Sequence, residues 1–570
     1  MNFYQQIITE IRERKIKTQK KLNEVKRALA KTDKLKTIPT NIEILLSLPK
    51  NKIKEFKIIL ITKPTRTISG VAPLAIMTKP FPCPHAQSGG PCLMCPGGPD
   101  SKFGDVPQSY TGREPATMRG IRNKYDAYLQ VFNRLEQYVL LGQNCEKAEL
   151  ILMGGTFPSF PVEYQEEFVT SAFKAMNDFS ELFYDQKDKT KFNYLKFKEF
   201  FELPAADLHD QERIKRIHER LFELKNKTKT TLETEQTRNE TAKIRCVALC
   251  IETRPDYGFL EQGNQMLKLG CTRVELGIQS VYDDVLKKIK RGHTAADTKK
   301  SIQILKDLGF KIGGHYMPGL PNTDPTKDLQ GMKLLFEDAD YKPDMLKIYP
   351  CMVVKGTQLY DEYKKGKFKP LNAEAAAKLI VEFKKFIPEY CRVQRVQRDI
   401  PTYQIEAGVE MTNLRQYMHN HFQVKCRCIR CREPKGEKIN WKKARLKVDE
   451  YAASKGKEFF ISAEADDTLI GFCRMRFPSE LLRKEITANS ALIRELHVYG
   501  TATALGEAGT VQHQGWGKKL MQKAEEIALA AGKNKMVVIS GIGAKEYYRK
   551  LGYKKEGVYM VKKLDNQVII

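Results

Sequence analysis

Short apolar runs alternate with longer amphipathic stretches over the middle of the chain, from about residue 71 to residue 395. The apolar runs are strand candidates and include AELILMGG, RCVALCIETRP, TRVELGIQS, FKIGGHYMPGLP and DMLKIYP. The stretches between them have helical periodicity, as in DDVLKKIKR and AADTKKSIQILKDLG. Strands that alternate with helices form βα units and a parallel sheet. The pattern therefore predicts an α/β domain built as a complete or partial (β/α) barrel.

Polar residues and glycines follow or end several of these predicted strands. Gly154 and Gly155 follow the first, Glu252 ends the second, Gln279 ends the third, and Lys347 lies in the last. The chemistry of (β/α) barrels takes place at the carboxyl ends of their strands. We expect the functional residues of this domain at the same ends.

The first 70 residues combine a helical apolar pattern with a strong positive charge. Phe3, Ile7 and Ile11 recur every fourth position, and basic residues occupy the other faces. Residues 1–66 contain 17 Lys and Arg against 6 Asp and Glu. We predict a basic helical N-terminal arm over residues 1–70 that lies along phosphates; a basic helix packed on its own domain is the alternative.

The remaining chain divides into three further segments. Residues 186–243 are highly charged and poor in apolar residues, which predicts a partly helical surface insertion without a chemical role. Residues 396–450 form a basic linker, and residues 451–570 read as a separate α+β domain. In that domain LIGFCRMRF, ALIRELHVYG and KMVVISG are predicted strands, and GWGKKLMQKAEEIALAAG is a predicted helix.

Composition points to a polyanionic partner and away from membranes. The chain has 570 residues and a formal net charge of +28, for which nucleic acid is the expected partner and a merely solvated basic surface the alternative. No uninterrupted apolar run is long enough for a membrane span, and the N-terminus lacks a signal peptide. We expect a cytoplasmic location, where thirteen cysteines do not form a disulfide framework.

Three of these cysteines lie in the stretch FPCPHAQSGGPCLMCPGGPD, with the spacing C-x8-C-x2-C. A structural zinc site or an iron–sulfur cube normally has four protein ligands, so Cys83, Cys92 and Cys95 leave one position open. An open position suits a catalytic metal. His85 is an alternative fourth ligand of a structural zinc ion.

A second group of three cysteines lies in the linker, in KCRCIRCRE. The tight spacing of Cys426, Cys428 and Cys431 predicts a structural zinc site. The fourth ligand is left open, with His419 and His421 as candidates. Arginines lie between the cysteines and suggest a basic surface that faces RNA.

The stretch QHQGWG in the C-terminal domain has the form Q-x-x-G-x-G and opens the predicted helix. Backbone N–H groups at the start of a helix bind anions, and glycines allow a pyrophosphate to approach them. Gln512, Gly515 and Gly517 are therefore candidates for a nucleotide-cofactor site.

Ordered motifs from about residue 70 to residue 565 resemble one family, the catalytic acetyltransferase subunit of Elongator, here in a stand-alone form. They are CPH…C…CPGGPDS, QSYTGREPATMR, MGGTF, IETRPD, CTRVELGIQSVYDDV, RGHT, LKIYP, RVQRDIP and RELHVYG. The family joins a radical S-adenosylmethionine (SAM) domain to a GNAT acetyltransferase domain. The resemblance implies a radical SAM (β/α) partial barrel fused to a C-terminal α+β GNAT domain.

The resemblance also assigns cofactors to residues. Cys83, Cys92 and Cys95 would hold a [4Fe–4S] cluster whose free iron chelates SAM, and Gly154 and Gly155 would meet the SAM amino group. A larger set would bind acetyl-CoA: Glu495, Leu496, His497 and Val498 along the acyl arm, Gln512, Gly515, Trp516, Gly517 and Lys518 at the phosphates, Tyr548 or its neighbour Tyr547 near the thioester, and Lys147 from the radical domain.

The reaction that the resemblance implies is carboxymethylation of the wobble uridine of tRNA at carbon 5. A SAM-derived radical removes hydrogen from the methyl group of acetyl-CoA, the carbon radical adds to the uracil, and thioester hydrolysis leaves a carboxymethyl group. The anticodon stem-loop of tRNA would be the partner, with a homodimer or Elongator-like subunits as further partners. The alternatives are a protein lysine acetyltransferase with structural metal sites and a tRNA-binding scaffold.

Overall fold

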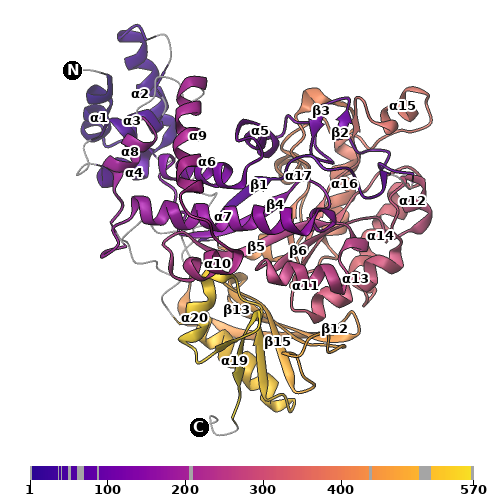
Figure 1. Ribbon diagram of the computed structural model, residues 1–570. Helices are drawn as coiled ribbons and strands as arrows, with labels where there is room; N and C mark the ends of the chain where they lie inside the picture. The colour runs from indigo at the N-terminus through magenta and orange to yellow at the C-terminus, as the bar shows by residue number, and fades with distance from the viewer. Residues whose placement is uncertain are drawn as a thin grey trace.

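The computed structural model describes residues 3–35, 38–39, 41–48, 53–60, 70–86, 89–189, 191–203, 210–434, 439–499 and 515–565. Two seven-stranded sheets organise the chain, one in the middle of the sequence and one at its C-terminal end. In Figure 1 the second sheet lies below the first, and the N-terminal helices lie at the upper left.

The first sheet is a half-barrel of parallel strands, as the alternating pattern predicts. Its strand order is β1-β4-β5-β6-β7-β8-β10, and every neighbouring pair is parallel. The strands are β1 (Ala72–Met77), β4 (Lys147–Met153), β5 (Arg245–Thr253), β6 (Arg273–Gln279), β7 (Lys311–Tyr316), β8 (Met345–Ile348) and β10 (Arg392–Arg395).

Helices cover the outer face of the half-barrel. Val274, Leu276 and Ile278 alternate along β6 and join the main apolar core, whereas Arg273 and Glu275 point to the opposite, inner face. The covering helices include α5 (Pro115–Arg122), α6 (Ala127–Leu140), α7 (Val162–Phe183), α11 (Leu260–Lys268), α12 (Asp283–Lys288), α13 (Ala295–Asp307), α14 (Pro325–Glu337), α16 (Ala373–Lys384) and α17 (Leu414–His421). The helix α15 (Gln358–Lys364) instead contacts the loop of the first cysteine group.

Two small two-stranded sheets and a one-turn helix complete the middle of the chain. The strands β2 (Gly98–Ser101) and β3 (Gly104–Val106) pair with each other, as do β9 (Val353–Val354) and β11 (Ile405–Ala407). The short helix α18 (Ile429–Arg432) carries part of the second cysteine group.

The second sheet has the order β12-β13-β14-β15-β16-β18-β17. Its strands are β12 (Arg445–Ala453), β13 (Gly456–Ala465), β14 (Thr468–Phe477), β15 (Ser490–Val498), β16 (Lys535–Val538), β17 (Lys554–Glu556) and β18 (Tyr559–Lys563). The pair β15 and β16 is parallel and the other pairs are antiparallel. The helices α19 (Trp516–Ala530) and α20 (Lys545–Arg549) belong to this domain, and α19 contacts β13, β14 and β15.

The C-terminal domain docks on the amino ends of the parallel strands. Arg494 donates to the backbone oxygen of Phe310 at 2.7 Å, directly before β7 begins. Tyr559 donates to the backbone oxygen of Leu308 at 2.9 Å. The first cysteine group follows the carboxyl end of β1. The acetyltransferase-like domain and the three-cysteine loop therefore lie at opposite ends of the half-barrel.

The N-terminal segment is helical, as expected, and its helices pack on one another. Phe3, Ile7 and Ile11 of α1 share a buried apolar cluster with Leu22 of α2 and Phe56 of α4. The four helices are α1 (Phe3–Glu13), α2 (Gln19–Thr32), α3 (Asn41–Ser47) and α4 (Ile53–Leu60). The segment is thus a small helical unit with its own core, as in the packed alternative.

The charged segment 186–243 is more deeply embedded than its composition indicates. Phe197 and Phe201 are 1% and 0% exposed and belong to the main core. They are part of a cluster of phenylalanines that packs the segment against α7. Its helices are α8 (Tyr194–Phe200), α9 (Gln211–Asn226) and α10 (Leu232–Thr241). Glu240 of α10 also forms ion pairs with Lys545 and Arg549 of α20. The expectation of a surface insertion is therefore wrong for this part of the segment.

Across the described part of the chain, no helix has the length and apolar character that crossing a bilayer requires.

Candidate active site at the two ends of the half-barrel

The loop that follows β1 carries the first three cysteines and is tied down at several points. Leu93 donates its backbone N–H to the oxygen of Ile289 at 3.1 Å and accepts from the N–H of Leu359 at 2.8 Å. Arg291 donates to the sulfur of Cys92 at 3.6 Å. Gln108 donates to the sulfur of Cys95 at 2.9 Å, and such donors stabilise thiolate charge.

The three cysteines face one another closely enough to interact. Burial raises the pKa of the Cys83 thiol, and the neighbouring thiols of Cys95 and Cys92 raise it further. Among the described residues, the sulfurs of Cys426, Cys428 and Cys431 all lie within 4.8 Å of one another. The sulfurs of Cys83, Cys92 and Cys95 do not all lie this close together. Thiolates that each bind a different iron of a cube stand farther apart than thiolates that share one ion. The spacing of the sulfurs therefore fits a cluster better than a single zinc ion.

His85, the alternative zinc ligand, faces an arginine. Its Nε2 lies 3.2 Å from NH2 of Arg254. Burial and the positive charge of Arg254 lower the pKa of the imidazole. A side-chain Cβ at Gly292 would lie 1.7 Å from the same nitrogen, so the glycine leaves room for the histidine.

Among the described residues, several buried polar atoms near the cysteine loop have no hydrogen-bond partner. They include Oγ1 of Thr78, Oε1 of Gln279 and both ring nitrogens of His293, together with single nitrogens of Arg254 and Arg291. Buried polar groups are nearly always paired, so this concentration marks a place for a polar ligand. The amino, carboxylate and ribose groups of SAM have the matching chemistry. The residues present therefore fit the cofactor pair that the cysteines imply.

The glycines after β4 are required by close packing. Gly154 has φ +130°, and a Cβ there would lie 2.0 Å from Oγ1 of Thr78. Gly155 has φ +110° and lies against Gln108. Gly97 meets the loop's own backbone, since a Cβ there would lie 2.2 Å from the oxygen of Tyr110. Gly97 is therefore required by the packing of the loop.

At the other end of the half-barrel, strand β15 separates from its neighbour. It pairs with β14 as far as Val498 but with β16 only as far as Ile493. A register shift between Arg474 and Met475 bends the ladder at Arg494. Residues Glu495 to Val498 thus leave the ladder with β16, and their backbone forms an edge to which an extended pantetheine arm can hydrogen-bond.

The start of helix α19 lies beside this edge. Gly515 caps the helix in the left-handed conformation, with φ +75°. A Cβ at Gly517 would lie 2.6 Å from the hydroxyl of Tyr547 and 3.7 Å from Val498. The helix start, the end of β15 and Tyr547 therefore converge. Trp516 is buried and Lys518 is exposed, whereas Gln512 lies outside the described residues.

The two tyrosines of α20 differ in exposure. Tyr547 is 39% exposed, whereas Tyr548 is 7% exposed and belongs to the apolar core of the domain. Burial raises the pKa of both phenols, and most strongly that of Tyr548. Tyr547 is therefore the tyrosine better placed to reach a cofactor at the start of α19.

Charged residues of the radical domain contact the end of β15, residues Glu495 to Val498, which we call the acyl-arm strand. Glu495 of β15 pairs with Lys311 at the start of β7 and with Arg474 at 2.8 Å. Burial would raise the pKa of Glu495, but Lys311 and Arg474 outweigh it and hold the pKa at about 2. Burial lowers the pKa of His497 to about 4, helped by cations that include Lys147 at the start of β4. Lys147 is thus close enough to His497 of β15 to interact with it electrostatically.

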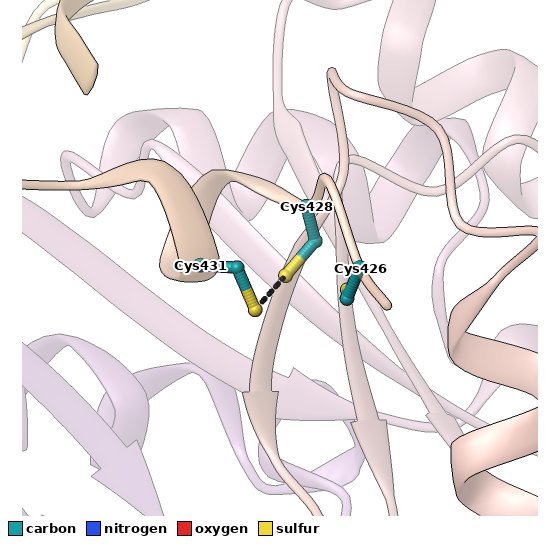
Figure 2. A group of neighbouring side chains, drawn as sticks. All are labelled: Cys426, Cys428 and Cys431. Atoms are coloured by element: carbon teal, nitrogen blue, oxygen red, sulfur yellow. Dashed lines mark hydrogen bonds between the residues drawn. The ribbon is translucent and has the colours of Figure 1, made fainter. Parts of the chain in front are cut away.

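The second cysteine group converges on a single point. Figure 2 shows the sulfurs of Cys428 and Cys431 facing each other, and they lie 3.6 Å apart. All three sulfurs, including that of Cys426, lie within 4.8 Å of one another. Hydrogen bonds from the other two thiols lower the pKa of Cys428, which prepares a thiolate. Lys384, 3.8 Å from the Cys431 sulfur, adds a positive charge.

Neither candidate for a fourth zinc ligand joins this group within 4.8 Å among the described residues. His421 packs its ring against Tyr417 at 4.3 Å, at the end of α17. The three sulfurs fit one tetrahedral ion, and the fourth ligand stays open.

The sequence pointed to two members of a group on the inner face of the half-barrel, Glu252 and Lys347, but missed Glu275 and His315. Glu252, Glu275, His315 and Lys347 come from four successive strands and meet inside it. The available signal was a charged residue in the apolar run TRVELGIQS and a histidine in FKIGGHYM. Periodicity alone could not separate them from solvent-facing positions.

Four family models match successive parts of the chain. They are the ELP3 N-terminal domain over residues 1–68, the radical SAM superfamily over 204–329, the radical SAM C-terminal domain over 343–423 and the acetyltransferase (GNAT) family over 419–553.

Full-length relatives match as well. The chain is 44% identical to the tRNA uridine(34) acetyltransferase of Methanocaldococcus jannaschii over 542 residues, 92% of this chain and 91% of that protein. It is 37% identical to Elongator complex protein 3 of Dictyostelium discoideum over 561 residues, 96% of this chain and 92% of that protein. The solved structure of Methanocaldococcus infernus Elp3 lacking residues 1–46 matches with a TM-score of 0.69 and 39% identity, covering 87% of this chain and 100% of that one.

Proposed function

Because this chain belongs to the family of tRNA uridine(34) acetyltransferases and Elongator complex protein 3, we propose that it makes 5-carboxymethyluridine at the wobble position of tRNA. It is an acyltransferase that joins a radical SAM domain to a GNAT domain, as the motifs predicted. Modification of the wobble uridine is the activity that the relatives' names describe. The carboxymethyl product and the radical route are the finer part of the proposal.

The observation that supports this proposal most directly is that one half-barrel has a candidate cofactor region at each of its two ends. The three-cysteine loop and its unpaired polar atoms lie at the carboxyl ends of the strands, and the acyl-arm strand docks at the amino ends. An ordinary acetyltransferase attacks the carbonyl carbon of acetyl-CoA with a nucleophile and uses no three-thiolate site. Carbon 5 of uracil is a poor nucleophile, so its modification gives both regions a purpose.

When bound, the cluster and SAM supply a radical and acetyl-CoA supplies the two carbons. Cys83, Cys92 and Cys95 would hold the cluster, with Arg291 and Gln108 stabilising the charge on their sulfurs. The chain's remaining task is to hold the reacting groups in place and exclude water.

At the other end the protein's backbone would do most of the binding. The free edge of Glu495 to Val498 would pair with the pantetheine arm, and the N–H groups that open α19 would bind the pyrophosphate. Tyr547 would contact the bound cofactor at the start of α19, and Lys147 would reach acetyl-CoA from the radical domain.

The second cysteine group would hold a structural zinc ion. Cys426, Cys428 and Cys431 lie close enough to share one ion. Ile429, between them, donates its backbone N–H to Cys391 at 2.9 Å, and Arg432 pairs with Glu464 of β13 at 2.7 Å. The ion would therefore stiffen the connection between the two domains.

The tRNA anticodon stem-loop would bind the basic helical unit at the N-terminus. Lys17, Lys20, Lys21, Arg27 and Lys31 are exposed around α2. Such a surface neutralises phosphates without reading sequence. A homodimer, Elongator-like subunits and a cytoplasmic location stay predictions.

The test is an anaerobic incubation of the full chain with SAM, a reductant, acetyl-CoA and unmodified tRNA. Nucleosides from the digested tRNA are analysed by mass. The expected result is 5-carboxymethyluridine that requires all four additions. Acetylated lysine on added protein, with no altered uridine, would support the lysine acetyltransferase instead.

Matched cysteine variants assign the first metal site. Cys92→Ser should lose iron and sulfide after anaerobic reconstitution and make no modified nucleoside. Cys145→Ala, a core cysteine before β4, should keep both. Full iron content in Cys92→Ser would contradict the proposed cluster ligands.

A further inference from the structure

A charged group spans the inner face of the half-barrel, between its two ends. Glu252 of β5, Glu275 of β6, His315 of β7 and Lys347 of β8 come from four neighbouring strands. Glu275 is 1% exposed, and the side chains of Lys347 and His315 are 10% and 14% exposed. Barrel interiors are usually filled by branched apolar side chains. Charges in such a place cost free energy, so they point to chemistry.

The contacts within the group are specific. Nε2 of His315 lies 2.8 Å from Oε2 of Glu275. Nζ of Lys347 donates to Oε1 of Glu252 at 3.1 Å and also pairs with Glu275. Tyr110, from the segment after the cysteine loop, donates to Oε2 of Glu252 at 3.4 Å. The group therefore connects to the cysteine end of the half-barrel.

A second chain of contacts connects the same strands to the acyl-arm end. Lys311, at the start of β7, pairs with Glu495 of β15. His315 lies four residues further along β7, which is about 13 Å in an extended strand. The histidine thus stands between the acyl-arm strand and the strand ends that carry the cysteine loop.

A divalent metal ion is the less suitable occupant. The ligand atoms of Glu252, Glu275 and His315 do lie within 4.8 Å of one another. The ammonium group of Lys347 already pairs with both carboxylates and takes the place of the cation. A bound divalent ion would have to displace that ammonium group against like-charge repulsion.

We propose that His315 is the general base that activates the water for thioester hydrolysis, positioned by Glu275, with Lys347 stabilising the oxyanion. This inference rests on the proposed function, in which the two-carbon group is joined to the uracil while still bound to CoA. It assigns the hydrolytic residue, which the sequence left open.

The protonation states support this role. A carboxylate only accepts hydrogen bonds, so Nε2 of His315 carries the proton and Nδ1 is the basic nitrogen. Burial and the charge of Lys347 lower the pKa of His315, which keeps the imidazole neutral near pH 7. A neutral histidine can accept a proton from water.

The step balances without an oxidant or reductant. The water oxygen attacks the thioester carbonyl carbon, and one water proton passes to Nδ1 of His315. The negative charge on the carbonyl oxygen is stabilised by the ammonium group of Lys347. The carbon–sulfur bond then breaks, CoA leaves as the thiolate, and His315 returns the proton to it. The products are a carboxyl group on the nucleoside and free CoA thiol.

The test uses the reconstituted full-length protein and the variant His315→Gln. We expect CoA thiol release to fall about 100-fold, the usual contribution of a general base. Release of 5′-deoxyadenosine and the dissociation constants for acetyl-CoA and tRNA should stay within about twofold of the wild type. Digested tRNA should contain uridine still linked to CoA through the thioester, detected by its mass.

His315→Ala adds a second variant in case the glutamine disturbs folding. Added imidazole should restore CoA release in this variant, because it can occupy the space and accept the proton. His218→Gln, a buried histidine of α9 far from the strand ends, is the matched control and should behave as wild type.

Wild-type CoA release and full carboxymethylation in both His315 variants would overturn the inference. So would loss of 5′-deoxyadenosine release without any CoA-linked uridine, because His315 would then act before hydrolysis. If the wild type forms no SAM-dependent nucleoside at all, the proposed function itself fails.

Discussion

Buried charges such as those of Lys311 and Lys347 are stable in the interior because oppositely charged side chains pair with them. Lys311 pairs with Glu495, and Lys347 pairs with Glu252 and Glu275. A buried charge without a partner would cost several kcal/mol. The direction of each pKa shift follows from which partner outweighs burial.

Glu495→Gln tests the pair that joins the acyl-arm strand to the radical domain. The native pKa of Glu495 is about 2, below the ordinary value of 4.5. Its ionised form therefore stabilises the fold by about 3 kcal/mol above pH 5, and that contribution is lost as pH falls from about 4.5 to 2. The free energy of unfolding, measured in denaturant, should be much larger for the wild type than for Glu495→Gln at pH 7, and the difference should be smaller at pH 3.5. An equal difference at the two pH values would contradict the assignment of the pKa to Glu495.

Gly517→Ala tests the convergence at the start of α19. The new Cβ would lie 2.6 Å from the hydroxyl of Tyr547, so the tyrosine has to move. We expect acetyl-CoA to bind about tenfold more weakly, about 1.4 kcal/mol, by calorimetric titration. Adding Tyr547→Phe removes the clashing oxygen and should recover most of the affinity. A double variant as weak as the single one would show that the clash is not the cause.

At the scale of an element, helix α2 carries both core and surface residues. Leu22 and Ala30 are buried, whereas Lys20, Lys21 and Arg27 are exposed. The apolar face of the helix stabilises the N-terminal unit, and its basic face is free for phosphates. The two roles can therefore be changed independently.

Lys17→Gln, Lys20→Gln and Lys21→Gln together should weaken tRNA binding without unfolding the helix. Each lost phosphate contact lowers the slope of log affinity against log salt by about 0.7 to 0.9. Filter binding over a range of salt concentrations measures both the affinity and the slope. The matched triple variant at the exposed Lys550, Lys554 and Lys555 of the C-terminal domain should leave both unchanged. Equal losses in the two triples would indicate non-specific charge attraction.

For the whole molecule, the decisive feature is a buried ionic network between the two sheets. Asp344, directly before β8, accepts from Arg494 of β15 at 2.7 and 2.8 Å. Arg476 of β14 pairs with Asp307 at the end of α13, and Glu458 of β13 joins the two arginines. Burial opposes ionisation of Asp344, but Arg494 and Arg474 keep its pKa well below the usual range.

Asp344→Asn should destabilise the docking of the two domains. Removing one charge from a buried network leaves its partner uncompensated, at a cost of about 3 to 5 kcal/mol. Differential scanning calorimetry should show a single transition separating into two as the C-terminal domain unfolds first. Glu374→Gln, which breaks an exposed pair with Lys378 on α16, should leave the thermogram unchanged. An unchanged thermogram for Asp344→Asn would contradict the network's role.

The alternating apolar pattern predicted the parallel strands because each strand buries one face against helices. The motifs around Cys83 and Gly154 predicted the radical SAM domain, and RELHVYG with QHQGWG predicted the GNAT domain. The charged segment 186–243 was misjudged because the phenylalanines of KFNYLKFKEFF lie among many lysines and acidic residues, which lower the apolar content of the stretch. Their packing on α7 becomes visible only in three dimensions.

Local sequence by itself determined the central strands β4 to β8, the strands β14 to β16, several helices, the two cysteine groups and the family. These depend on spacing along the chain, which the sequence records directly. Only the tertiary structure decided that the two cofactor regions lie at opposite ends of the half-barrel. It alone brings Glu275, His315 and Lys347 together inside. Those residues are up to 72 positions apart, and their proximity depends on parallel strands aligned in register. A one-residue shift would turn each of them to the other face.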